Sequence, residues 1–110
     1  MHAEIVNVDG LTMMAKSDTN HWMVMDTTRE GQPAAAATPM ETFLFGFGGC
    51  FCMTVKSLLL KKRLDVGKVS MRIDAQRAPE PPTAFTKIDA VLEFAGGSLR
   101  DSDVEWAVSL

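Results

Sequence analysis

The sequence predicts a single α+β domain in which antiparallel sheets surround a long, buried central helix. Segments near both ends of the 110-residue chain alternate apolar and polar side chains, a pattern typical of half-buried strands. A long stretch in the middle has no internal proline and starts with a helix-capping pattern. These two observations define the fold class, and nothing in the chain indicates a repeat or a second domain.

The first part of the chain predicts three strands. Residues 3–9 alternate and end in an Asp-Gly pair, which favours a hairpin turn into a second strand over residues 11–16. Residues 21–26 form the third predicted strand. The connection that follows, residues 27–37, is longer than most loops and contains a glycine and a proline. Loops of this length often carry function, so we expect a functional residue here.

The central helix is predicted from Pro39 to about Arg63. Thr38 supplies a capping hydroxyl, Pro39 suits the first helical position, and Glu41 stands three residues after the cap. Cations at residues 61–63 suit the negative end of the helix dipole. The helix should therefore end before residues 65–67.

The last part of the chain predicts a hairpin and a helix. Residues 68–77 and 85–95 read as strands, and residues 78–84 form a proline-rich turn between them. A helix follows from Ser98 to Leu110. It lacks a capping glycine and a cation in its last turn, so we expect the chain to stop inside this helix.

Composition excludes several classes of function. A net charge of −3 lacks the basic excess of nucleic-acid-binding proteins, and the basic segment 56–77 contains no aromatic residue for base stacking. Two cysteines are too few for a disulfide-stapled secreted protein, and no signal peptide is recognisable. We therefore expect a cytoplasmic protein.

The apolar part of the central helix predicts a homodimer. From Phe43 to Val55 apolar side chains surround the helix axis, and such a helix must be enclosed by protein or lipid. A membrane span needs about 20 uninterrupted apolar residues, whereas charged Glu41 and Lys56 bound this run. One small domain cannot easily enclose the helix. Two copies could do so, and the glycines at 46, 48 and 49 would let paired helices approach closely.

Two readings of the cysteines stay open. Cys50 and Cys52 lie on different faces of the helix, and each could be a small core residue, as free cysteine often is. A reactive thiol instead needs a nearby cation, and Arg29 in the long loop is the candidate. With only two histidines we expect no zinc site and no cofactor. Eight methionines beside two thiols make a Cu(I) site a minor alternative, but Met13, Met14, Met23 and Met25 lie in strand patterns, where methionine more often fills gaps in a core.

A longer pattern of residues carries a resemblance. The order is Thr38-Pro39-Met40-Glu41, Phe43-Leu44, Gly48-Gly49-Cys50, Val55, Leu58 to Leu60 and Lys61-Lys62-Arg63. This order resembles the central helix of the OsmC/Ohr family. Asp9-Gly10-Leu11 and residues 21–26 resemble the opening strands of the OsmC-like branch, and Glu80, Pro82, Phe85, Thr86 and Ile88 are similar to its second hairpin.

The resemblance implies an intertwined homodimer that reduces organic hydroperoxides at thiols of the subunit interface. Cys50 matches the peroxide-attacking cysteine, with Arg29 favouring its thiolate. Glu41 is the glutamate candidate, although the family's glutamate directly follows the proline, where this chain has Met40. The implied partners are a small organic hydroperoxide and a dithiol reductant protein. The expected substrate pocket is lined by Phe43, Phe47, Phe51 and Met53.

The family's second, resolving cysteine lies beyond the last residue of this sequence, so we expect the C-terminal part of the family fold to be missing. Cys52 is the alternative second thiol. Two further readings follow from these departures. The chain could be a fragment, or it could be a non-catalytic dimeric module that binds a small hydrophobic ligand.

Overall fold

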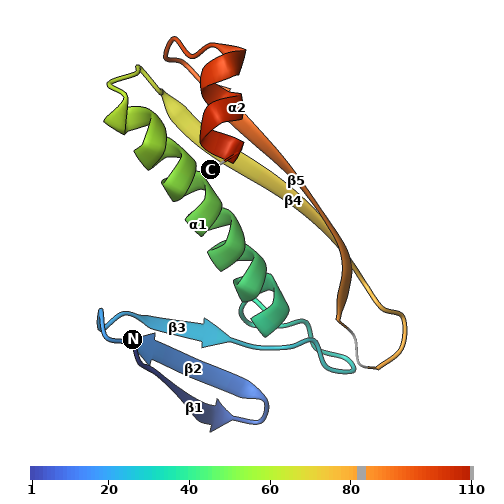
Figure 1. The fold of residues 1–110 in the computed structure, drawn as a ribbon. Helices are drawn as coiled ribbons and strands as arrows, with labels where there is room; N and C mark the ends of the chain where they lie inside the picture. The colour runs from blue at the N-terminus through green and yellow to red at the C-terminus, as the bar shows by residue number, and fades with distance from the viewer. Residues whose placement is uncertain (82–83, 110) are drawn as a thin grey trace. The chain divides into compact units, whose positions relative to one another are not determined.

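A computed structural model describes residues 1–81 and 84–109. Its order of elements is β1 (Ala3–Asp9), β2 (Thr12–Ser17), β3 (Trp22–Met25), α1 (Pro39–Lys61), β4 (Lys68–Arg77), β5 (Phe85–Ala95) and α2 (Asp101–Ser109) (Figure 1). The predicted α+β class, with antiparallel sheets and one long helix, is confirmed. The chain forms two compact units, residues 1–46 and 47–110. Pro82 and Leu110 lie outside the described residues.

The first unit contains an antiparallel sheet in the order β1-β2-β3. The predicted Asp-Gly turn joins β1 to β2, and Gly10 adopts the positive φ of 53° that this turn needs. Within this unit the sheet has little cover, because large apolar side chains on both faces are exposed. These side chains are Ile5, Val6, Val8, Trp22, Met23 and Val24.

The long connection after β3 is held by backbone hydrogen bonds. Asp26 N donates to Ala37 O at 3.1 Å, and Arg29 and Gln32 exchange two bonds of 3.0 and 2.9 Å. The predicted capping box then starts α1: Thr38 N donates to Glu41 Oε1 at 2.9 Å, and Glu41 N donates to Thr38 Oγ1 at 3.2 Å. The loop is therefore an ordered link between sheet and helix.

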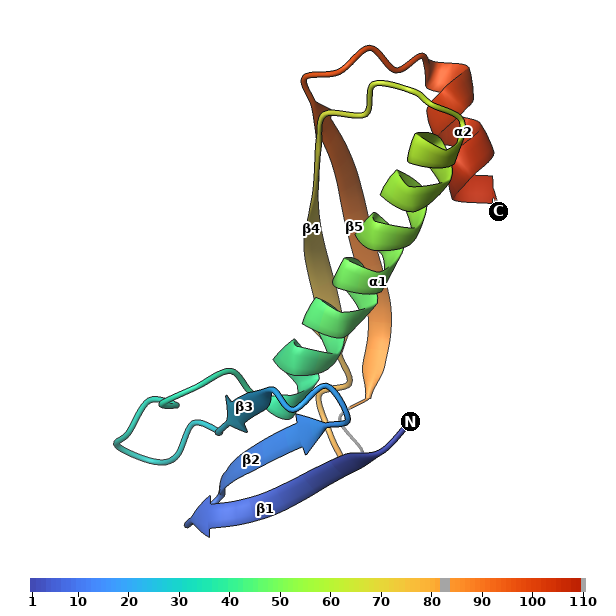
Figure 2. The same cartoon turned by 90° about the vertical axis from the view of Figure 1, so that its left-hand side faces the viewer.

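In the second unit, α1 runs along the β4–β5 hairpin and α2 lies near the end of α1 (Figures 1 and 2). The hairpin pairs from Lys68↔Ala95 to Arg77↔Phe85. The core of the second unit is small, and Leu59 at its centre is fully buried, with 0 % exposure. The other buried apolar residues are Val55, Val66 and Ala107, and partly buried Phe51, Leu58, Leu64, Val69, Leu92, Phe94, Leu99 and Trp106 pack against them.

Both helices are shorter than the sequence predicts. Helix α1 ends at Lys61, because Arg63 adopts a left-handed conformation with φ of 59° and Leu64 N donates back to Leu59 O. Helix α2 begins at Asp101 instead of Ser98, since Ser98 N donates to Asp65 O in the neighbouring loop. Helix ends depend on such tertiary contacts, which local sequence does not reveal.

Within the second unit only one face of α1 is covered. Gly48, Val55 and Leu59 are buried, whereas large apolar side chains elsewhere on the helix are exposed, Met53 at 75 %. By length and composition α1 is apolar enough to cross a membrane, a property that the core helices of soluble proteins share. The enclosure of this helix by a second copy of the chain stays a prediction.

Candidate functional site

The thiol of Cys50 lies on the uncovered side of α1. Successive residues of an α-helix are rotated by about 100°, so Leu59, nine positions later, is turned by about 180° from Cys50. Leu59 is at the centre of the core, and Cys50 is a free, exposed cysteine. The thiol is therefore not a core packing group of this protomer.

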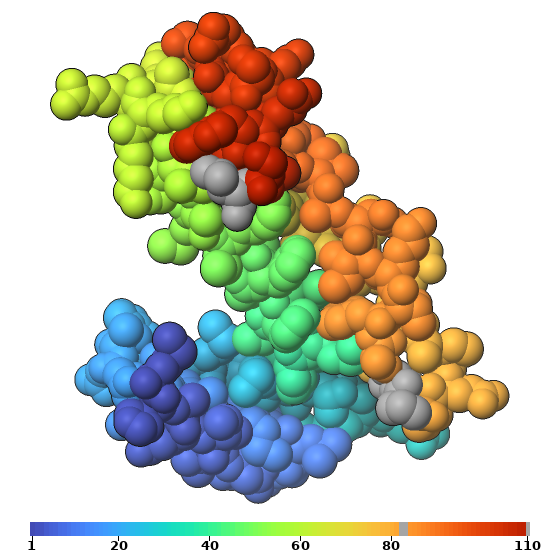
Figure 3. Space-filling view, viewed as in Figure 1, coloured from blue at the N-terminus to red at the C-terminus, as the bar shows by residue number. Residues whose placement is uncertain are grey.

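Apolar side chains flank Cys50 on the same side of the helix. Positions three, four and seven residues away share a helix face. Phe43, Phe47 and Met53 hold these positions and are all exposed, and the substrate pocket expected of them stays a prediction. Figure 3 shows atoms of α1, drawn in green, at the surface in that view. Phe51 differs, because it packs against the core.

Cys52 occupies a different environment. It is half-buried and is turned by about 200° from Cys50 around the axis. It lines an open pocket of about 320 Å³ together with Met53, Lys56, Lys68 and Val69. Both cysteines are free thiols, and the predicted separation of the two onto different faces is confirmed.

Arg29, the predicted cation, is held by a buried carboxylate. Its Nη2 atom donates to Asp26 Oδ1 at 3.2 Å and lies 3.4 Å from Thr12 Oγ1. Asp26 is only 5 % exposed, and its Oδ1 and Oδ2 also accept from Thr12 Oγ1 at 3.1 Å and from Ala35 N at 2.9 Å. The Arg29 side chain is 39 % exposed, so its remaining donors can face solvent or a ligand.

Hydrogen bonds explain the acidity of Asp26. The backbone N–H groups of Ala35 and Thr27, followed by the side chains of Arg29 and Thr12, lower the pKa of Asp26 from 3.8 to about 2. Partial desolvation opposes this shift. The carboxylate is therefore charged at every physiological pH.

Gly10 leaves space for the guanidinium of Arg29. A Cβ atom at Gly10 would lie 2.6 Å from Arg29 Nη1, so the guanidinium packs directly over the turn backbone. The sequence pattern pointed to Arg29 but not to its partners Gly10, Thr12 and Asp26. The available signal was the placement of Asp26 between an apolar strand and a loop arginine three residues later.

Glu41 acts as a helix cap in this structure. Its carboxylate accepts a hydrogen bond from the backbone N–H of Thr38, which lowers the pKa of Glu41 below its usual 4.5. Arg29 and Glu41 belong to the first unit, whereas Cys50 and Cys52 belong to the second. The joint action of these four residues therefore stays a prediction.

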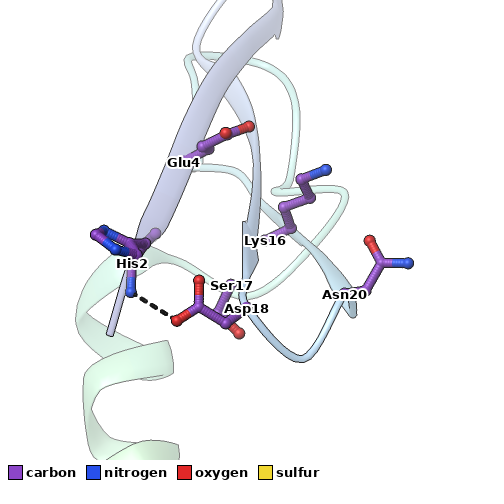
Figure 4. Close-up of a pocket in the computed structure, with 7 residues that line it drawn as sticks. His2, Glu4, Lys16, Ser17, Asp18 and Asn20 are labelled. Atoms are coloured by element: carbon purple, nitrogen blue, oxygen red, sulfur yellow. Dashed lines mark hydrogen bonds between the residues drawn. The ribbon is translucent and has the colours of Figure 1, made fainter.

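One further depression lies on the first sheet, and none of the predicted site residues lines it. An open pocket of about 300 Å³ lies between the ends of β1 and β2 and the turn after β2 (Figure 4). Its lining is polar, and His2 N donates to Asp18 Oδ2 at 3.1 Å across it. Within residues 1–81 and 84–109, no group of three His, Cys, Asp or Glu side chains is arranged to hold a metal ion.

Comparison with known proteins gives relatives over nearly the whole chain. Residues 14–108 match the OsmC family, described as OsmC-like protein. Protein YhfA of Escherichia coli K12 is 34 % identical over 110 residues, which are all of this chain and 80 % of YhfA.

Solved structures share the fold. An OsmC-like protein from Mycoplasma pneumoniae superposes with a TM-score of 0.83 at 17 % identity, over 98 % of this chain and 77 % of that one. An organic hydroperoxide resistance protein OsmC from Legionella pneumophila, also described as a predicted redox protein, gives a TM-score of 0.66 at 20 % identity, over 98 % and 78 %. The family match, the extent of the likeness to YhfA and the shared fold establish that this chain belongs to the OsmC-like protein family.

Proposed function

We propose that this protein is a thiol-dependent reductase of organic hydroperoxides in which Cys50 attacks the peroxide. The observation that carries the proposal is the exposure of Cys50 on the side of α1 opposite the core. A thiol that only filled the core would face Leu59 and Val55. The family includes redox proteins, and the Legionella relative is described as an organic hydroperoxide resistance protein.

The reaction uses only groups that the proposal names. The Cys50 thiolate attacks the terminal peroxide oxygen, the O–O bond breaks, and the alkoxide leaving group takes a proton to become an alcohol. Cysteine is oxidised to a sulfenic acid. A second thiol then attacks the sulfenic sulfur, releasing water and forming a disulfide, and a dithiol reductant protein restores both thiols by exchange.

The thiol that attacks the sulfenic acid can come from three sources: Cys52 of the same chain, Cys52 of a second copy, or the reductant protein. An intact helix separates the two side chains by about 200° of rotation, so Cys52 of the same chain cannot bridge to Cys50 without local unwinding. We therefore assign the second thiol to the reductant or to Cys52 of a second copy.

Arg29 and Glu41 complete the proposed chemistry. A guanidinium near Cys50 would favour the thiolate over the thiol, because it stabilises the negative charge. Glu41 would orient Arg29 by an ion pair in addition to capping the helix. Phe43, Phe47, Phe51 and Met53 would surround the organic part of the peroxide.

The proposal includes a homodimer that acts in the cytoplasm. Two uncovered apolar surfaces favour association: the Cys50 side of α1 and the β1–β3 sheet. Exposed apolar surface of this extent on a small protein marks an interface. A second copy would cover both surfaces and would place the two thiol sites at the interface.

Trapping of sulfenic acid tests the enzyme directly. Reduced protein is treated with cumene hydroperoxide in the presence of dimedone, and the modified peptide is identified by mass spectrometry. We expect the adduct on Cys50 in the wild type and in Cys52→Ser, and none at position 50 in Cys50→Ser. Absence of the Cys50 adduct, while a known peroxiredoxin is labelled in parallel, removes the enzyme proposal.

A second candidate is a dimeric module that binds a small hydrophobic ligand without chemistry. The exposed aromatic and methionine side chains beside Cys50 favour it. In that case the Cys50 thiol reacts with iodoacetamide at neutral pH no faster in the folded protein than in urea, and a hydrophobic fluorescent probe binds the dimer.

A further inference from the structure

Asp26 is a buried carboxylate that the proposed chemistry does not use. It lies directly after β3, and its side chain contacts two segments: the start of β2 at Thr12, and the loop before α1 at both Arg29 and Ala35. Buried charges are costly unless they are fully hydrogen-bonded, so such a residue usually holds its surroundings in one arrangement.

The hydrogen bonds divide between the two carboxylate oxygens. Oδ2 accepts from Ala35 N at 2.9 Å, which ties the far part of the loop to the end of β3. Oδ1 accepts from Thr12 at 3.1 Å and from Arg29 at 3.2 Å. The backbone N–H of Asp26 donates to Ala37 O at 3.1 Å, so one residue fixes the loop near both of its ends.

The arginine gains a defined position from this arrangement. A loop arginine has many rotamers, and restricting them beforehand reduces the entropy lost when the guanidinium binds an anion. Asp26 and Thr12 hold Nη2, and the missing side chain of Gly10 leaves room for Nη1.

We propose that Asp26 is the positioning residue of the peroxide site: it anchors loop 27–37 and thereby presets the Arg29 guanidinium for an anionic sulfur. This inference rests on the proposed function, in which Arg29 favours the Cys50 thiolate. Asp26 itself touches no reactant.

Limited proteolysis tests the anchoring independently of peroxide chemistry. Trypsin cleaves after arginine, so cleavage of the Arg29–Glu30 bond reports release of the loop. We expect Asp26→Asn to be cleaved there at least tenfold faster than the wild type. Asp89→Asn is the matched control, because Asp89 pairs with Lys87 only on the exposed surface, at 3.5 Å. Equal cleavage of wild type and Asp26→Asn overturns the anchoring.

A second variant covers the case in which Asp26→Asn does not fold. Thr12→Val keeps the size of the side chain and the charge of Asp26 but removes one hydrogen bond to the carboxylate. We expect a two- to fivefold increase in cleavage after Arg29, and no increase overturns the proposal.

A double-mutant cycle links Asp26 to the thiol through Arg29. The rate of Cys50 alkylation is measured from pH 5 to 9 in Asp26→Asn, Arg29→Gln and the double variant. Relative to the wild type, we expect both single variants to move the rise in alkylation rate to higher pH. The double variant should match Arg29→Gln. An additional shift in the double variant overturns action through Arg29. If Arg29→Gln alone changes nothing while cleavage increases in Asp26→Asn, the proposed role of Arg29 fails and the anchoring of the loop stands.

Discussion

Cys50 and Leu59 lie on opposite sides of helix α1, the first exposed and the second fully buried. This relationship divides the helix into a side that stabilises the protomer and a side that is available for association and chemistry. A residue that fills the core cannot meet a peroxide, whereas a residue on the other side needs only a partner surface to form a pocket.

Alanine substitutions at two glycines on different sides of α1 distinguish an effect on dimerisation from an effect on folding. Gly46 has no atom near the position of a Cβ, whereas a Cβ at Gly48 would lie 3.0 Å from Ile73 Cδ1. In an isolated helix, Gly46→Ala should be stabilising by about 1 kcal/mol. If a second helix packs there, we expect this variant to dissociate more readily.

Analytical ultracentrifugation measures the effect. We expect at least a tenfold weaker dimer for Gly46→Ala, and a lower melting temperature with unchanged association for the control Gly48→Ala. A monomeric wild type, or a Gly46→Ala variant that is only more stable, would contradict the dimer.

Two loop glycines distinguish a steric clash from backbone strain. Gly67 and Gly96 both have positive φ, of 71° and 74°. A Cβ at Gly67 would collide with the carbonyl oxygen of Ala95, whereas nothing lies near a Cβ at Gly96. We expect Gly96→Ala to cost about 1–2 kcal/mol of unfolding free energy from strain alone. Gly67→Ala should cost more than this in urea unfolding, and equal losses would refute the close contact.

The capping box predicts separate effects for its two residues. Thr38→Ala removes the hydroxyl that accepts from Glu41 N, and we expect a loss of about 1 kcal/mol in thermal unfolding. Glu41→Gln keeps an oxygen for Thr38 N but removes the charge that the lowered pKa of Glu41 shows to be favourable, so we expect a smaller loss of stability than in Thr38→Ala. If Glu41 also orients Arg29, the peroxide reaction slows in Glu41→Gln but not in Thr38→Ala; an unchanged rate in Glu41→Gln limits Glu41 to capping.

Acid should destabilise the fold through Asp26. Because the pKa of Asp26 is about 2 in the folded protein and near 3.8 when unfolded, its contribution is present above pH 4. The contribution is lost as the pH falls from about 4 through 2. Glu41 and Asp103, whose pKa values are also lowered, act in the same direction.

Urea unfolding midpoints between pH 7 and pH 2.5 measure this dependence. We expect Asp26→Asn to be less stable than the wild type at pH 7 and to lose less stability on acidification. Parallel curves for the two proteins would show that Asp26 does not contribute.

The sequence predicted most elements because their signals are local. Strict alternation over residues 68–77 and the capping pattern at Thr38 define a strand and a helix start wherever the rest of the chain lies. The end of α1 was harder to predict, because the helix ends where Arg63 adopts a left-handed backbone conformation. The contact of the loops at Gly67 and Gly97 joins segments that are distant in sequence.

The candidate site was predictable only in part. The resemblance identified Cys50, but an apolar pattern around the whole helix could not indicate which side the core would cover. Asp26 was missed because its partners Arg29 and Ala35 lie in a loop without periodicity. Hydrogen bonds within loops depend on backbone conformation. The spacing of apolar residues indicates helices and strands but gives no information on the conformation of a loop.

The peroxide reactivity of Cys50 can be measured as a single rate constant. The oxidation of Cys52→Ser protein by cumene hydroperoxide is followed at pH 7, in the folded state and in urea. We expect Cys50 in the folded protein to react at least a hundredfold faster than the unfolded thiol. Equal rates in the two states would contradict it.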